Sequence, residues 1–132
     1  MCTIARLSTV TTLAVSVTAI SLTACATSPI PDSNASTVHS SSVLAPDLLK
    51  ERPGTGKITV KRDSGWMGSA CTFRVFIDGR PVALLRNGER FDVFLAPGQH
   101  VLSSHPEGIC GGSTAEVEAL VALGQWKRYR ID

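Results

Sequence analysis

Short runs in which apolar and polar residues alternate dominate the chain from residue 57 onward. In the run 71–77, every second residue is apolar: Cys71, Phe73, Val75 and Ile77. Successive side chains of a β-strand point to opposite faces of a sheet, so a period of two predicts strands with one buried face. Similar runs at regular spacing predict strands over 57–62, 71–77, 81–85, 90–95, 99–104, 114–123 and 125–131.

Turn dipeptides separate these runs. Asp78 with Gly79, and Asn87 with Gly88, are typical of two-residue hairpins, in which both turn residues need positive φ. Pro97 with Gly98 fits a type II turn. The pattern predicts an all-β fold, a small antiparallel β-sandwich of about seven strands. Its central strands should form a meander over 71–77, 81–85 and 90–95.

The run 114–123 is ambiguous between strand and helix. Its apolar residues alternate, which favours a strand, yet Ala, Glu and Leu are also good helix formers. We expect a strand and leave the helix open.

Residues 1–24 have the layout of an export signal, with Arg6 near the start, an apolar stretch over 7–22 and small residues at the end. The residues at its end resemble the lipobox of bacterial lipoproteins: Leu22, Thr23, Ala24 and Cys25. In that motif a peptidase cuts before the cysteine, which then carries acyl chains such as palmitate. The resemblance implies that Cys25 is the lipidated first residue of the mature protein.

Two other outcomes of this segment stay open. Ala24, Cys25 and Ala26 also fit the small-x-small pattern of an ordinary secretory site, which would release a soluble protein from Thr27. An uncleaved anchor is the other alternative, and the length and polarity of the segment disfavour it.

The residues after Cys25 indicate location and organisation. Ala26 stands where an aspartate would resemble the inner-membrane retention signal of enteric-type bacteria, so we expect an outer-membrane anchor and a periplasmic domain. Residues 25–53 are expected to be the lipidated Cys25 and a disordered tether, because 26–42 is rich in Ser, Thr, Pro, Ala and Asn and has no apolar period. The part 43–52 either packs on the domain or continues the tether. Residues 54–132 form the expected β-sandwich domain.

Two of the four cysteines, Cys71 and Cys110, lie inside the expected domain. Exported proteins fold in an oxidising compartment, where two cysteines in a small domain favour a disulfide over two buried free thiols. Closing a loop of about 40 residues would stabilise the domain by about 4 kcal/mol in the chain-entropy model.

The composition and motifs exclude several function classes. The chain has 13 Lys plus Arg against 11 Asp plus Glu, a balance that argues against broad electrostatic binding of nucleic acid. Ser103, Ser104 and His105 lack the glycines of a nucleophile elbow, and His100 and His105 lack a compact metal-ligand spacing. We therefore predict no catalytic residue, no cofactor and no metal site.

Two features are candidates for partner binding. Trp66 and Met67, in a glycine-bracketed loop, would either anchor a partner or fold back over one end of the sandwich. Phe76 and Phe94 oppose the main apolar rows of two strands expected to be neighbours, so they indicate either strands covered on both faces or a recognition patch. Basic residues form either a rim to this patch or a solvated strand face: Arg74, Arg90, Lys127, Arg128 and Arg130.

Segments 75–79 (VFIDG) and 95–101 (LAPGQHV) place an aspartate-glycine hairpin ahead of a leucine-x-proline-glycine-x-histidine pattern, after a lead-in over 56–70. Together they resemble PEGA-like domains and, more closely, small bacterial β-sandwich lipoproteins of unassigned function, because the hallmark letters of PEGA are missing. The resemblance spans residues 54–132. It implies an immunoglobulin-like domain facing the envelope and implies no catalytic residues.

These features lead to one expected function. The chain is expected to be an outer-membrane lipoprotein whose non-enzymatic β-sandwich binds or scaffolds another envelope protein or a cell-wall component. A subunit of an envelope secretion machine and a periplasmic inhibitor are close alternatives. An envelope hydrolase with an unfamiliar site is the alternative from a different class.

Overall fold

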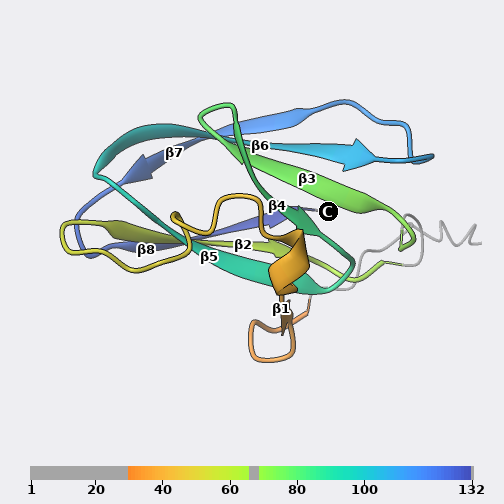
Figure 1. Cartoon of the computed structure of the whole chain (residues 1–132), viewed down its shortest axis with the longest axis horizontal. Coiled ribbons are helices and arrows are strands. Elements are labelled where there is room, and N and C mark those ends of the chain that lie inside the picture. The colour runs from red at the N-terminus through yellow and green to blue at the C-terminus, as the bar shows by residue number, and fades with distance from the viewer. Residues whose placement is uncertain (1–29, 66–68, 132) are drawn as a thin grey trace, which may run out of the picture.

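The alternating runs form strands that are arranged in two packed sheets (Figure 1). The computed structural model describes residues 30–65 and 69–131. Its elements are β1 (Ser36–Thr37), a 3₁₀ turn η1 (Ser40–Ser42), β2 (Gly56–Arg62), β3 (Thr72–Ile77), β4 (Arg80–Leu85), β5 (Glu89–Leu95), β6 (Gly98–Glu107), β7 (Ala115–Val121) and β8 (Trp126–Ile131). The predicted all-β sandwich is confirmed, and 114–123 contains a strand rather than a helix.

Sheet I has the strand order β1-β5-β2-β8, and sheet II has the order β4-β3-β6-β7. Neighbouring strands are antiparallel except for β1 beside β5 and β8 beside β2, which are parallel. The inward rows of both sheets meet in one apolar core, whose largest fully buried side chains include Phe91, Ile58, Leu85, Val60 and Val75. No helix in the described ranges is long and apolar enough to cross a membrane.

The expected meander over 71–77, 81–85 and 90–95 is wrong. β3 and β4 form the predicted hairpin, with positive φ at Asp78 (51°) and Gly79 (78°), but β5 belongs to the other sheet. The turn at Asn87 does not close a second hairpin. Instead, the Asn87 side chain accepts a hydrogen bond from Gly65 N at 3.1 Å and donates to Gly65 O at 3.3 Å. A turn dipeptide specifies a local reversal, and core packing decides which sheet the next strand joins.

The disordered tether predicted over 25–53 is wrong over 30–42, which packs on the sandwich. Of the two alternatives for 43–52, packing on the domain is the one that the structure has. Val38 and Ala45 are 6% and 0% exposed. Ser36 N donates to Gly88 O and Val38 N to Arg90 O, so this segment extends sheet I beyond β5. Residues 43–45 then follow the edge of β4 through hydrogen bonds to Val82 O. Backbone pairing at a sheet edge needs no apolar periodicity, which is why composition alone missed it.

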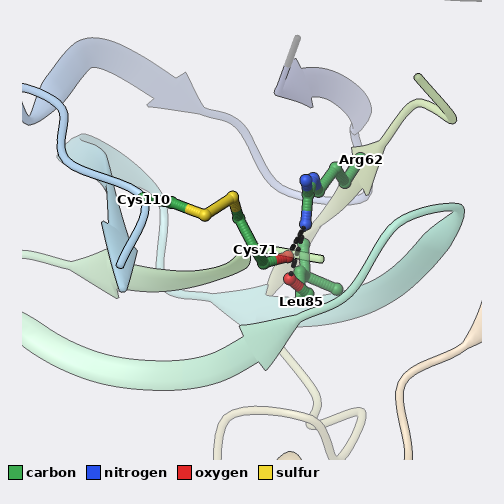
Figure 2. Close-up of a disulfide and its surroundings, with 4 residues drawn as sticks. All are labelled: Arg62, Cys71, Leu85 and Cys110. Atoms are coloured by element: carbon green, nitrogen blue, oxygen red, sulfur yellow. Dashed lines mark hydrogen bonds between the residues drawn. A yellow bond between two sulfur atoms is a disulfide. The ribbon is translucent and has the colours of Figure 1, made fainter. Parts of the chain in front are cut away.

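The predicted disulfide is present. Cys71 and Cys110 are bonded, with their Cα atoms 5.8 Å apart, and they link the start of β3 to the loop between β6 and β7 (Figure 2). The bond closes a loop over a sequence separation of 39 residues. It therefore fixes a long glycine-containing loop against sheet II.

Removing this disulfide should lower the free energy of unfolding by about 3–4 kcal/mol, because the unfolded chain regains the entropy of an open loop. Urea unfolding of the Cys71→Ala/Cys110→Ala chain, beside the oxidised and reduced wild type, measures the change. Reduced wild type controls for the altered side chains and should lose a similar amount. An unchanged urea midpoint in both would contradict a stabilising role.

Candidate functional site

A cleft of about 630 Å³ lies between the two sheets at the side where β7 and β8 form their edges. Its apolar lining includes Val75 and Leu102 from sheet II and Tyr129 and Ile131 from sheet I. This volume falls within the usual range of protein ligand pockets, which are lined mainly by apolar groups with a few polar ones. The cleft is therefore the strongest candidate for a binding site within the described residues.

The cleft follows from the sizes and places of the surrounding residues. The N-terminal segment covers the β5 and β4 edges on the opposite side, whereas β7 and β8 have no further strand beside them in the described part of the chain. Small residues line the mouth of the cleft at Ala115 and over 111–113. With little side-chain volume to fill the gap, the two sheets stay apart at this edge.

Arg62 lies at the end of the cleft as a buried positive charge. It occupies the inward row of β2 after Ile58 and Val60, and it is 5% exposed. Its Nη1 donates to the carbonyl oxygens of Cys71 and, at 3.4 Å, Leu85 (Figure 2). Its guanidinium also lies 4.5 Å from the centre of the Phe73 ring. One side chain of sheet I thus bonds to backbone at two places on sheet II.

Burial lowers the pKa of Arg62 from its usual value, while the nearby Glu89 carboxylate opposes this change. A guanidinium titrates so far above neutrality that the group remains charged in the folded protein. The cleft therefore has a fixed positive charge at one end, close to the disulfide.

The two histidines of the sandwich already have hydrogen-bond partners, none of which is a serine of the cleft. Ser104 is buried and lines the cleft. His105 Nδ1 lies 3.1 Å from Thr114 Oγ1, and both ring nitrogens of His100 have acceptors elsewhere. No group of three or more His, Cys, Asp or Glu side chains within 30–65 and 69–131 is arranged to hold a metal ion.

His100 forms a clamp between two turns. Its Nδ1 lies 2.7 Å from Asp78 Oδ2, and its Nε2 lies 2.8 Å from Ala96 O. Asp78 Oδ1 also accepts from Val101 N at 2.8 Å. Because both imidazole nitrogens face acceptors, the charged imidazolium satisfies the arrangement best. Hydrogen bonds thus connect the aspartate-glycine and proline-glycine-x-histidine segments, whose bonded residues are not part of the cleft lining.

The outer face of sheet I has a second polar arrangement. Trp126 Nε1 donates to Thr59 Oγ1 at 2.8 Å, and this hydroxyl donates to Asp92 Oδ1 at 2.6 Å. Lys57 Nζ lies 2.8 Å from Asp92 Oδ2. Arg128 and Lys57 approach the Trp126 ring, with their charged groups 3.9 and 4.9 Å from its centre. This network holds an exposed tryptophan among cations.

The N-terminal segment begins on the same outer face. Asp63, whose side chain is 0% exposed, accepts from Ile30 N at 3.4 Å and from Arg130 Nε at 2.8 Å. Asp32 forms ion pairs with Lys61 at 3.2 Å and Arg128 at 2.9 Å. Hydrogen bonding from Lys61 is the main reason that the pKa of Asp32 falls below its usual value. The chain is thereby fixed to sheet I at its first described residues.

Phe76 and Phe94, one of the two predicted partner-binding features, do not form one patch. Phe76 lies on β3 and Phe94 on β5, so the expectation that their strands are neighbours is wrong, because the two strands belong to different sheets. Both side chains are half-buried. Trp66, Met67, the cleavage motif 22–24 and Cys25 lie outside the described residues.

The predicted basic rim also divides between the two sheets. Arg74 pairs with Glu107 on sheet II, while Arg90, Arg128 and Arg130 belong to sheet I. Lys127 of β8 pairs with Ile58 of β2, which belongs to the inward row. Lys127 therefore does not share the outward-facing row of Arg128 and Arg130.

Sequence reasoning missed Arg62, Asp63 and Trp126 as organising residues. A signal for Arg62 was present, since it continues the alternating row of Ile58 and Val60 toward the core and is charged. Asp63 bonds to Arg130 of β8, and Trp126 of β8 bonds to Thr59 of β2. Each pair is separated by more than sixty residues, so no local pattern indicates it.

No protein-family model matches the chain, and no curated protein sequence matches it significantly.

The clamp at His100 should make stability depend on pH. Burial opposes the imidazolium, but the hydrogen bonds to Asp78 and the Ala96 carbonyl outweigh it, so the pKa of His100 is raised. Hydrogen bonding from His100 lowers the pKa of Asp78. The histidine contribution is complete below the unfolded pKa of about 6.5 and disappears as pH rises through the folded value. The aspartate contribution disappears only as pH falls below about 4.

We therefore expect the stability gap between wild type and His100→Asn to be about 1 kcal/mol near pH 5–6 and smaller above neutral pH. Urea unfolding across pH measures it. In an Asp78→Asn background the same substitution should lose most of its pH dependence. A gap that stays constant from about pH 5 to pH 9 would show that the clamp is not charged.

Proposed function

We propose that this chain is a lipid-anchored, non-enzymatic protein of the cell envelope, and that its β-sandwich binds another envelope component in the cleft between β7 and β8. The cleft is the observation on which this proposal rests. It combines the volume of a ligand site with an apolar lining and a fixed charge at Arg62.

The partner that fits this site is an extended segment of an envelope protein. β7 is the last strand of sheet II, so the backbone groups along its outer edge are not used by a neighbouring strand in the described residues. An added strand would pair with that edge and place alternate side chains in the cleft, as in β-strand addition. Val117, 45% exposed on β7 and part of the cleft lining, would contact the added segment.

A binding role is favoured over hydrolysis by the engagement of the ionisable side chains. A serine nucleophile needs a base within hydrogen-bond reach. Ser103 and Ser104 are buried hydroxyls that line the cleft, whereas His105 is bonded to Thr114 and His100 to Asp78. Asp63, also at the cleft, is bonded to Arg130 and the N-terminal backbone. These arrangements support holding a partner more than transferring protons.

The lipid anchor is supported by the lipobox-like end of the leader at Leu22, Thr23, Ala24 and Cys25. A lipid at Cys25 would place the sandwich at a membrane, and the outer membrane with the domain in the periplasm is the location that Ala26 favours.

Changing Cys25→Ser should move the protein out of the membrane fraction or leave it as a larger uncleaved precursor, because no thiol remains for acylation. Fractionation of cells with intact-mass analysis measures both. Cys2→Ser is the matched control, since it alters the other leader cysteine and should leave mature mass and fraction unchanged. Wild type that is soluble and unacylated would refute the anchor.

A photo-crosslinking residue at Val117 should form an adduct with an envelope protein in living cells, and the same residue at Leu120 should not. Both lie on β7, but Leu120 alternates to the outer face and is 63% exposed against 45% for Val117. Exposure alone would therefore favour position 120. Equal or stronger adducts from position 120, or none from 117, would contradict binding in the cleft.

A further inference from the structure

The two outer faces of the sandwich differ in charge. Strand alternation and the ion pairs place basic groups on the outer face of sheet I at Lys57, Lys61, Arg90, Arg128 and Arg130. Three carboxylates accompany them, from Asp32, Asp63 and Asp92. On the outer face of β3, β6 and β7, Arg74 accompanies Glu107, Glu116 and Glu118. One face is thus net positive and the other net negative.

The described chain begins at the positive face, and only a short segment of sequence separates this point from Cys25. Ile30 is already bonded to Asp63 and Lys61 there. Cys25 precedes Ile30 by five residues, and five residues can span at most about 18 Å. A lipid on Cys25 would therefore hold Ile30, which is bonded to this face, within about 18 Å of the anchor.

The exposed tryptophan on this face fits a membrane interface. Trp126 is 50% exposed, and its ring contacts Arg128 and Lys57. Tryptophan is favoured at head-group depth, where its ring is amphipathic, and Lys and Arg are attracted to anionic head groups. Electrostatic attraction acts over about one Debye length, roughly 8 Å in physiological salt. The attraction between such a face and the lipid head groups is therefore strongest when the face lies directly on the bilayer surface.

We propose that the outer face of sheet I, formed by Lys57, Arg90, Trp126, Arg128 and Arg130, is a membrane-docking surface that lies on an anionic phospholipid bilayer. This inference builds on the proposed lipid anchor. The lipid and the basic patch act together, because the lipid keeps the domain close to the bilayer and the patch is then attracted to anionic head groups. Docking through sheet I turns the acidic face of sheet II away from the lipid and leaves the cleft at the side, open to a partner.

The binding test uses the mature chain without its lipidated Cys25, residues 26–132, which retains every described residue and needs no lipid. Co-sedimentation with vesicles of phosphatidylcholine containing about 40% phosphatidylglycerol is compared with pure phosphatidylcholine, at low and at high salt. We expect binding to the anionic vesicles, little binding to the neutral ones, and loss of binding in high salt. Circular dichroism and an intact disulfide confirm the fold of each variant.

Arg90→Glu/Arg128→Glu should weaken vesicle binding about tenfold or more, because two attractions become repulsions. Arg74→Glu/Arg80→Glu changes the net charge equally, at residues paired with Glu107 and Asp47 away from this face, and should retain most of the binding.

The proposal is overturned if the mature chain ignores anionic vesicles or if both double variants lose binding equally. It is also overturned if the chain prefers a soluble anionic polymer, such as polyglutamate, over vesicles of equal charge. None of these results depends on Cys25, so failure of the docking surface is distinguishable from failure of the anchor, which fractionation reports separately.

Discussion

Two adjacent buried charges at the end of β2 connect sheet I to sheet II on one side, and to β8 and the N-terminal segment on the other. Arg62 points inward and joins sheet I to backbone carbonyls of sheet II, beside the disulfide. Asp63 binds Arg130 of β8 and the amide of Ile30 on the outer face. A buried charge is costly without partners, so both groups depend on the hydrogen bonds and charges around them. The position of the N-terminal segment and the end of the cleft both depend on this pair.

The site of N-terminal docking determines how the protein could function at a membrane. Had the chain joined the domain at residue 54, a long tether would have let the sandwich turn freely. With Ile30 fixed by Asp63, the described chain begins at the basic face of sheet I, five residues after Cys25 in the sequence. In the proposed arrangement, one face meets the lipid while the β7 and β8 edges remain available for a partner.

The predictable features were those with local causes. Period-two alternation identified the strands, the pair Asp78 and Gly79 identified a hairpin, and two cysteines in an expected exported domain identified the disulfide. The assignment of β5 to the second sheet follows from core packing, which a turn dipeptide does not encode. Docking of 30–53 uses backbone pairing at sheet edges, and the cleft forms between edges contributed by β7 and β8, so neither has a local pattern. The roles of Cys25, Trp66 and Met67 remain predictions.

Hydrogen exchange at two backbone amides tests the central claim that the folded domain begins near Ile30. Ser36 N donates to Gly88 O at 3.1 Å, and Val38 N donates to Arg90 O at 2.8 Å. Amides held in this way exchange only when the segment opens. Nuclear magnetic resonance of the mature chain should therefore show slow exchange at both amides, within the range of the neighbouring strand β5. Exchange at the rate of an unstructured peptide at both positions would show that the segment is a free tether and would contradict the account.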